Sequence, residues 1–138
     1  MSNLTIGHLA KKASVGVETI RFYERKGLIQ QPPKPSSGGY RSYSSAEVER
    51  VRFIRSAQQL GFSLREIDEL LSLEADPDAD CQDVHAKAKH KLEEVEQKLK
   101  RLRAVRSALK SIITTCPKKG RAAGRCTILQ ALNTKNNR

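Results

Sequence analysis

Tryptophan is absent from the sequence, and aromatic residues make up only 4% of its 138 residues. This scarcity argues against a large globular core, because aromatic side chains supply much of the apolar area that such cores bury. The length suits one compact domain plus an extended element.

Long apolar runs are absent too, so we expect no membrane-spanning segment. The first five residues hold no basic stretch followed by an apolar one, so we expect no secretory signal.

Cysteine is also scarce, with only Cys81, Cys116 and Cys126 in the chain. An odd number of cysteines without a secretory signal favours reduced thiols in the cytoplasm over a disulfide framework. Acidic residues are outnumbered by basic ones, which gives a formal net charge of +11. Chains this basic usually bind nucleic acid or an anionic membrane surface. We favour nucleic acid and expect no membrane partner.

Glycine and proline are missing from the whole stretch between Cys81 and Cys116. Apolar residues recur there at steps of three and four, as on one face of a long helix: Val84, Ala88, Leu92, Val95, Leu99, Leu102, Val105, Leu109 and Ile112. Such a helix is about 50 Å long at roughly 1.5 Å per residue, so Cys81 cannot meet Cys116 within one chain. In an antiparallel pair of helices, Cys81 of one chain arrives beside Cys116 and Cys126 of the other. We therefore expect a homodimer with two three-thiol sites.

Shorter helices are expected before this long one. A helix capped by Thr5 and a second helix over residues 17–26 are joined by a tight turn, which is the pattern of a helix-turn-helix. Residues 28–43 are rich in proline and glycine and have short β-prone pieces at Leu28–Ile29 and Tyr40–Tyr43. This pattern predicts a hairpin or wing.

Two further helices carry capping signals, at Ser44 and at Ser63. The sequence thus predicts a mainly α protein in which a winged helix-turn-helix precedes a long dimerisation helix that forms an antiparallel coiled coil. The expected parts are a DNA-binding domain over 1–75, a linker over 76–80, the dimerisation helix over 81–115, a metal-binding loop and short helix over 116–132, and a disordered tail over 133–138.

The second helix of a helix-turn-helix lies in the major groove, where side chains near its start contact base edges and phosphates. The residues that we expect to contact DNA lie on this helix and on the return side of the wing: Thr19, Arg21, Tyr23, Arg41 and Tyr43. An arginine on the wing is long enough to reach a phosphate or the minor groove. Ile20 and Phe22 are expected to pack inward instead.

Three thiolates without a clear fourth ligand suit a soft metal ion that accepts three-coordination, whereas zinc normally takes four ligands. Cys81 lies at a helix start, where the macrodipole favours a thiolate. The loop between Cys116 and Cys126 holds four basic residues and no acid, which offsets the negative charge of a three-thiolate site. His85 lies four residues after Cys81 on the same helix face. It is a candidate fourth ligand for zinc, cadmium or lead, although a lone histidine is more often simply solvated.

Five segments carry a recognisable pattern: Thr5–Ala10, Val17–Leu28, Tyr40–Tyr43, Val51–Ile54 and Leu60–Ile67. In these segments the chain resembles the MerR family of transcription regulators. The resemblance covers residues 4 to about 129, and the run Thr-Ile-Arg-Phe-Tyr at 19–23 is highly specific to it. It implies a winged-helix homodimer on promoter DNA whose −35 and −10 elements are too far apart. Effector binding untwists and kinks the DNA, so that RNA polymerase already present can open it.

Within that family the three cysteines resemble the ligands of the mercury(II) sensors. The resemblance implies that Cys116 and Cys126 bind Hg(II) together with Cys81 of the opposite subunit, at two sites per dimer. It also implies a cytoplasmic regulator that activates mercury-resistance genes with metal, and represses or weakly activates them without it. The loop from Cys116 to Cys126 is one residue longer than in those sensors. Zinc(II), cadmium(II) and lead(II) therefore stay as alternative ions.

Other classes of protein fit the sequence less well. A cysteine-dependent enzyme has one candidate pair, Cys81 with His85, in an open-helix setting without a visible pocket. A thiol redox sensor would need a closely spaced cysteine pair or a cysteine cluster. A drug-sensing regulator would need a sizeable ligand-binding domain, for which residues 117–138 are too few. We therefore expect no enzymatic activity.

Overall fold

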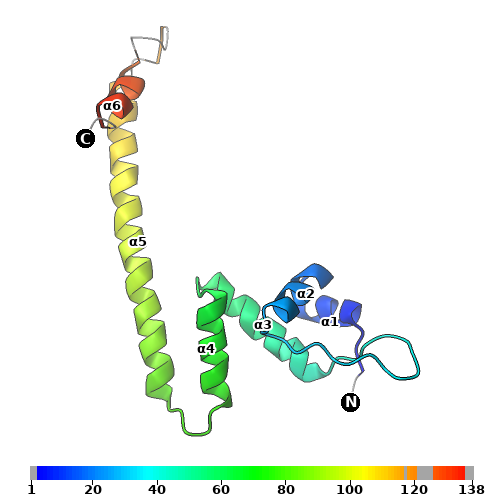
Figure 1. Ribbon diagram of the computed structural model, residues 1–138. Coiled ribbons are helices and arrows are strands. Elements are labelled where there is room, and N and C mark those ends of the chain that lie inside the picture. Colours follow the sequence, from blue (N-terminus) through cyan, green and yellow to red (C-terminus); the bar gives the residue numbers. More distant parts are fainter. Residues whose placement is uncertain (1–2, 117, 121–125, 136–138) are drawn as a thin grey trace. The chain divides into compact units, whose positions relative to one another are not determined.

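A computed structural model describes residues 3–116, 118–120 and 126–135 of the chain. Its elements are all helices (Figure 1): α1 (Ile6–Ala13), α2 (Val17–Arg25), α3 (Ser45–Gln59), α4 (Leu64–Ala75), α5 (Cys81–Thr115) and α6 (Thr127–Lys135). The predicted mainly α fold is confirmed. The chain divides into two compact units, residues 1–87 and 88–138. Among the described residues, none of the helices contains a stretch long and apolar enough to cross a membrane.

The first unit is built around a core that α1, α2, α3 and α4 share. Helix α1 contacts both α2 and α3, and α3 contacts α4. The largest side chains that are fully buried come from all four helices: Leu9, Ile20, Tyr23, Val51, Ile54 and Ile67. Each buried aliphatic side chain of this size contributes about 1.5–3 kcal/mol of transfer free energy. This small core fixes α2, the second helix of the helix-turn-helix, against its neighbours.

Local capping explains where the helices begin. The Thr5 hydroxyl accepts a hydrogen bond from the backbone N–H of His8 at 3.2 Å. At α4 the capping box is complete, since Ser63 N–H donates to Glu66 at 2.9 Å and Glu66 N–H donates to the Ser63 hydroxyl at 3.2 Å. At α5 the Asp80 carboxylate accepts from the backbone N–H of Gln82 at 2.7 Å. These side chains satisfy backbone donors that a helix start leaves unpaired.

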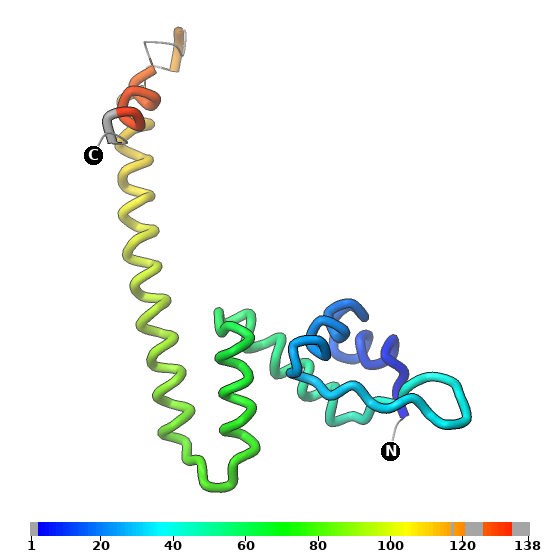
Figure 2. Tube along the Cα trace, viewed as in Figure 1, coloured from blue at the N-terminus to red at the C-terminus, as the bar shows by residue number. Residues whose placement is uncertain are grey.

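The segment between α2 and α3 differs from the expected wing, because the described residues contain no strand. Tyr43 pairs instead with Leu4, in an isolated antiparallel bridge with backbone hydrogen bonds of 2.8 and 2.9 Å. Leu28 and Ile29 are buried in the core rather than paired in a hairpin. Prolines are the physical reason, because residues 32, 33 and 35 have no backbone N–H to donate to a strand partner. The tube in Figure 2 shows this segment as an open loop, in cyan.

Helix α5 has the predicted bounds. Helix α6 is longer than the short helix expected near the end of the chain. The structure gives α5 as 35 residues, Cys81–Thr115. The last helix begins at Thr127 and continues to Lys135, so residues 133–135, expected in a disordered tail, are helical. The remainder of that expected tail, residues 136–138, lies outside the described residues. The hydroxyl groups of Thr115 and Thr127 lie 3.4 Å apart and connect the end of α5 to the start of α6.

Candidate metal centre and nucleic-acid interface

The outer face of α2 presents Arg21 to solvent, while Ile20 is fully buried, as expected. Arg21 Nη1 lies 3.3 Å from the carboxylate of Glu18, one turn earlier, in an exposed ion pair. Thr19 is half-buried on the same helix. Exposed ion pairs are worth little, so Arg21 can exchange its partner for a phosphate at small cost.

Two tyrosines of the predicted DNA-contacting set are core residues instead. Tyr23 is 1% exposed, and its hydroxyl donates to the Gln58 side chain at 2.6 Å. Tyr43 is 3% exposed, and its hydroxyl donates to Glu24 at 2.9 Å. The expectation that these rings face DNA is corrected, because both rings pack inward and both hydroxyls have protein partners. The apolar area of each ring stabilises the core more than exposure at the surface would.

Residues of α2 and of the loop between α2 and α3 (residues 26–44, here the wing loop) line a cavity of about 280 Å³. Arg21 and Arg41 both line it, with Lys34 and Glu24 beside them. Arg41 Nε donates to the carbonyl oxygen of Pro32 at 2.8 Å, so this arginine also holds the two arms of the loop together. Lys34 was not among the residues singled out from the sequence. The signal that identifies it is its place at the tip of a proline-rich loop next to the recognition helix.

At the other end of the chain, the structure brings two of the three predicted metal ligands together. Cys126 directly precedes α6, and the backbone N–H groups of Leu129 and Ile128 donate to its sulfur. These donors, with a side-chain hydrogen bond from Cys116, lower the pKa of the Cys126 thiol, although partial burial opposes them. Both thiols are free and half-buried. A thiolate held at a helix start beside a second thiol is suited to binding a soft metal ion.

Cys81 lies at the first position of α5, exposed to solvent and far along the helix from the other two cysteines. Among the described residues, no three cysteine, histidine or acidic side chains come together in a metal-binding group. His85 is exposed, as the sequence predicted. A single chain therefore presents a two-thiol site at one end of α5 and one thiol at the other.

A seven-residue repeat joins the two ends of α5. Its members are Cys81, Ala88, Val95, Leu102, Leu109 and Cys116. Residues spaced by seven stay on one face when two helices supercoil around each other. Both cysteines thus lie on the same stripe as the apolar residues. That stripe is open in the single chain, where Leu102 is 65% exposed and Leu109 is 52% exposed.

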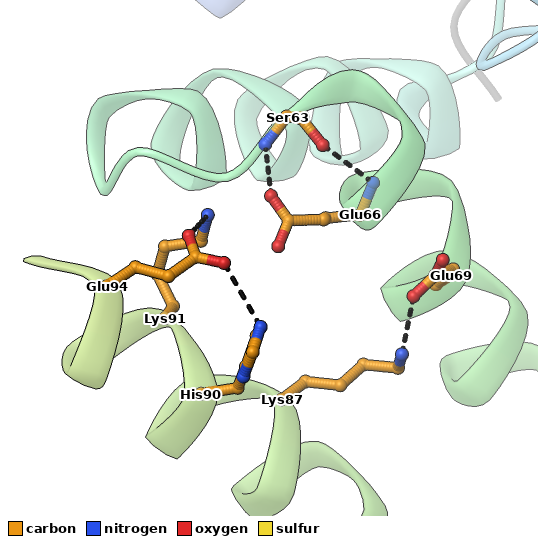
Figure 3. Close-up of polar contacts among 7 residues, drawn as sticks. All are labelled: Ser63, Glu66, Glu69, Lys87, His90, Lys91 and Glu94. Atoms are coloured by element: carbon orange, nitrogen blue, oxygen red, sulfur yellow. Dashed lines mark hydrogen bonds and ion pairs between the residues drawn. The ribbon is translucent and has the colours of Figure 1, made fainter.

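Ion pairs lie along the first half of α5 (Figure 3). Lys87 Nζ lies 2.5 Å from the carboxylate of Glu69 on α4. Glu94 accepts a hydrogen bond from Lys91 at 2.7 Å and lies 3.1 Å from the Nε2 atom of His90. His90 thus has a carboxylate neighbour on its own helix.

Two family models and a relative of known role match this chain. Residues 4–74 match the family model described as MerR HTH family regulatory protein, and residues 48–112 match the model described as MerR, DNA binding. The chain is 45% identical over 133 residues to a mercuric resistance operon regulatory protein of Shigella flexneri, which covers 96% of this chain and 89% of the relative.

Two solved structures are similar along nearly the whole chain. The first is the transcription regulator PbrR691 from Ralstonia metallidurans CH34 in complex with lead(II), with a TM-score of 0.81, 35% identity, and coverage of 94% of this chain and 98% of that one. The second is the regulator MerR from Bacillus megaterium MB1 in complex with mercury(II), with a TM-score of 0.70, 35% identity, and coverage of 94% and 99%. The chain belongs to the MerR family of helix-turn-helix regulatory proteins.

Proposed function

We propose that this protein is a metal-responsive transcription regulator that binds promoter DNA as a homodimer and activates mercury-resistance genes when it binds Hg(II). The single observation that carries the metal assignment is the placement of Cys116 at the end of α5 and Cys126 at the start of α6, next to Thr115 and Thr127, whose hydroxyl groups lie 3.4 Å apart. The similarity to a mercuric resistance operon regulatory protein and to a mercury(II)-bound regulator supports the choice of ion.

The donor set suits a soft ion. Sulfur ligands select soft metals, and a thiol must lose its proton before it can bind one. The lowered pKa of Cys126 reduces the cost of that step. Cys81, Cys116 and Cys126 would hold the ion, and Hg(II) would supply a soft Lewis acid that binds thiolates tightly.

The third thiol comes from a second copy in this proposal. Cys81 begins a helix about 50 Å long at roughly 1.5 Å per residue, so it does not reach Cys116 of its own chain along that helix. The seven-residue repeat supports a partner helix, because burial of the open apolar stripe would drive association. An antiparallel partner would bring Cys81 beside Cys116 and Cys126 of the other chain. Each dimer would then hold two sites, each formed by Cys81 of one chain and Cys116 with Cys126 of the other.

On the DNA side, the proposed contacts are Thr19, Arg21 and Arg41, with Lys34 added from the structure. Their side chains lie on α2 and on the loop after it, and three of them line one cavity. Positive charge at such a groove attracts phosphates, and the second helix of a helix-turn-helix reads base edges. The regulator would act in the cytoplasm, where it would distort the promoter for RNA polymerase.

Lead(II), with zinc(II) or cadmium(II), is the second candidate effector. It is favoured by the similarity to the lead(II)-bound regulator PbrR691. His85, exposed four residues after Cys81, offers the nitrogen ligand that a tetrahedral site would use.

Promoter output measured with each metal tests the proposal. Mercury(II) should induce transcription in the parent protein and in a His85→Ala variant alike. Replacement of any one cysteine by serine should abolish induction and leave DNA binding intact. A site that uses His85 would instead lose affinity by about one to two powers of ten in the histidine variant. If the parent protein does not respond to mercury, and the His85→Ala variant loses its induction by zinc, cadmium or lead, then one of these three ions is the effector instead of mercury.

A further inference from the structure

Charge along the second half of the chain is strongly divided. Within α5, residues 81–96 hold four acidic and three basic residues, whereas residues 97–115 hold six basic residues and no acidic one. The division falls in the middle of α5. In a parallel pair of α5 helices the two basic halves would lie side by side and repel each other. In an antiparallel pair each basic half lies along the half that holds all the acidic residues of the helix, so charge complementarity favours that direction.

Two of these charges, Glu96 and Arg103, border the apolar stripe of α5. With Leu92 and Leu99 at heptad position a and Val95 at position d, both charged residues take position e, at the edge of the stripe. Both side chains are exposed. Among the described residues, neither of them makes an ion pair within the chain. They are therefore available to a partner helix.

The register of an antiparallel pair brings these two residues together. Twofold symmetry places the same flank of each helix side by side, so position e of one copy faces position e of the other. The midpoint of Cys81 and Cys116 lies between residues 98 and 99, and the midpoint of Glu96 and Arg103 lies between residues 99 and 100. This offset amounts to a displacement of about 3 Å between the paired residues at roughly 1.5 Å per residue, which a long arginine side chain spans.

We propose that Glu96 of one copy pairs with Arg103 of the other, twice per dimer, and that these two ion pairs fix the direction and register of the α5 helices. The occupant of the apolar stripe is thus a second copy of this chain. The inference rests on the homodimer proposed above. The same register brings Cys81 to the end of the partner helix where Cys116 and Cys126 lie. Chains that lack the pair would be disfavoured as partners, so the pair also serves as a specificity determinant.

A charge exchange between two variants tests this inference. Glu96→Arg alone places like charges opposite each other in both pairs of its homodimer, and so does Arg103→Glu alone. Each homodimer should dissociate at a concentration about tenfold or more above that of the parent, measured by sedimentation. When the two variants are mixed, both pairs regain opposite charges. Native mass spectrometry should then find heterodimers well above the share of about half that random pairing gives.

Glu93→Arg and Lys100→Glu provide the matched control. These residues are also seven apart and exposed, and they undergo the same charge reversals, but they take heptad position b, away from the stripe. Both control variants should dimerise like the parent and mix at random. Parent-like homodimers of the Glu96 and Arg103 variants, or random mixing between them, would overturn the ion-pair proposal alone. A folded monomer of the parent chain at micromolar concentration would overturn the proposed homodimer itself.

Discussion

Single residues illustrate how the same side-chain types serve different purposes in this chain. Arg21 is exposed on α2, whereas Tyr23, two residues later, is a core residue held by Gln58. On a short helix this alternation divides the residues into one set that holds the fold and another that faces outward. The proposed DNA contact therefore falls on Arg21, and a test of that contact leaves the core intact.

Replacement of Arg21 by alanine should weaken operator binding by about tenfold or more and reduce the slope of log affinity against log salt by about one unit. The reason is the loss of one positive charge beside the phosphates, while the ion pair with Glu18 that is also lost is exposed and worth little. Binding titrations at several salt concentrations measure both quantities. Lys98→Ala on α5 serves as the control and should bind the operator like the parent. Unchanged operator affinity of the Arg21 variant would contradict the assignment of α2 as the recognition helix.

At the scale of elements, the wing loop is attached to the first unit through Tyr43. Its backbone pairs with Leu4, and its hydroxyl donates to Glu24 on α2. Burial, the hydrogen bond to Glu24 and the charge of that carboxylate together raise the pKa of Tyr43 to about 12, although Arg41 and Arg21 oppose the shift. The folded state thus holds this proton more tightly than the unfolded chain does.

This shift makes stability depend on pH in the alkaline range. The contribution of Tyr43 is fully present below the ordinary tyrosine pKa of about 10 and is lost as the pH rises through the folded value of about 12. Urea unfolding measured between these pH values should show a falling free energy of unfolding. The decrease should be smaller in Tyr43→Phe. Tyr40→Phe, at a side chain that is 82% exposed, should follow the parent. Identical pH profiles for the parent and Tyr43→Phe would refute this attachment.

Elements with local signals could be predicted from the sequence, and contacts distant in sequence could not. The bounds of α5 and the capping box at Ser63 follow from residues within a few positions of each other. The burial of Tyr23 and Tyr43 depends on Gln58 and Glu24, which lie 35 and 19 residues away. No local pattern contains those partners. The β-prone ends of residues 28–43 predict strands that pair with each other, but the backbone of Tyr43 pairs with Leu4 instead.

The same distinction applies to the candidate metal site. The sequence singled out all three cysteines, and the structure brings Cys116 and Cys126 together where α5 ends and α6 begins. Cys81 stays at the far end of α5 in each chain. A site that two chains share cannot form within either chain alone, so a single chain does not show it. The feature of one chain that relates Cys81 to Cys116 is their place in the same seven-residue repeat.

At the scale of the whole molecule, we propose a three-thiolate site shared between two copies of the chain. The most direct measurement uses a mixed dimer of a Cys81→Ser chain and a Cys116→Ser/Cys126→Ser chain. One chain lends Cys81 and the other lends Cys116 and Cys126, so one complete site should form. Each variant alone forms none.

Mercury titration of the purified mixed dimer, followed by the thiolate-to-mercury absorption of a three-coordinate site, measures this outcome. A shared site predicts one three-coordinate mercury per mixed dimer, none in either variant homodimer, and partial recovery of mercury-dependent promoter output. Coordination within a single chain predicts no such site in the mixed dimer. A mixed dimer without three-coordinate mercury, alongside a parent dimer that binds two, would contradict the shared site.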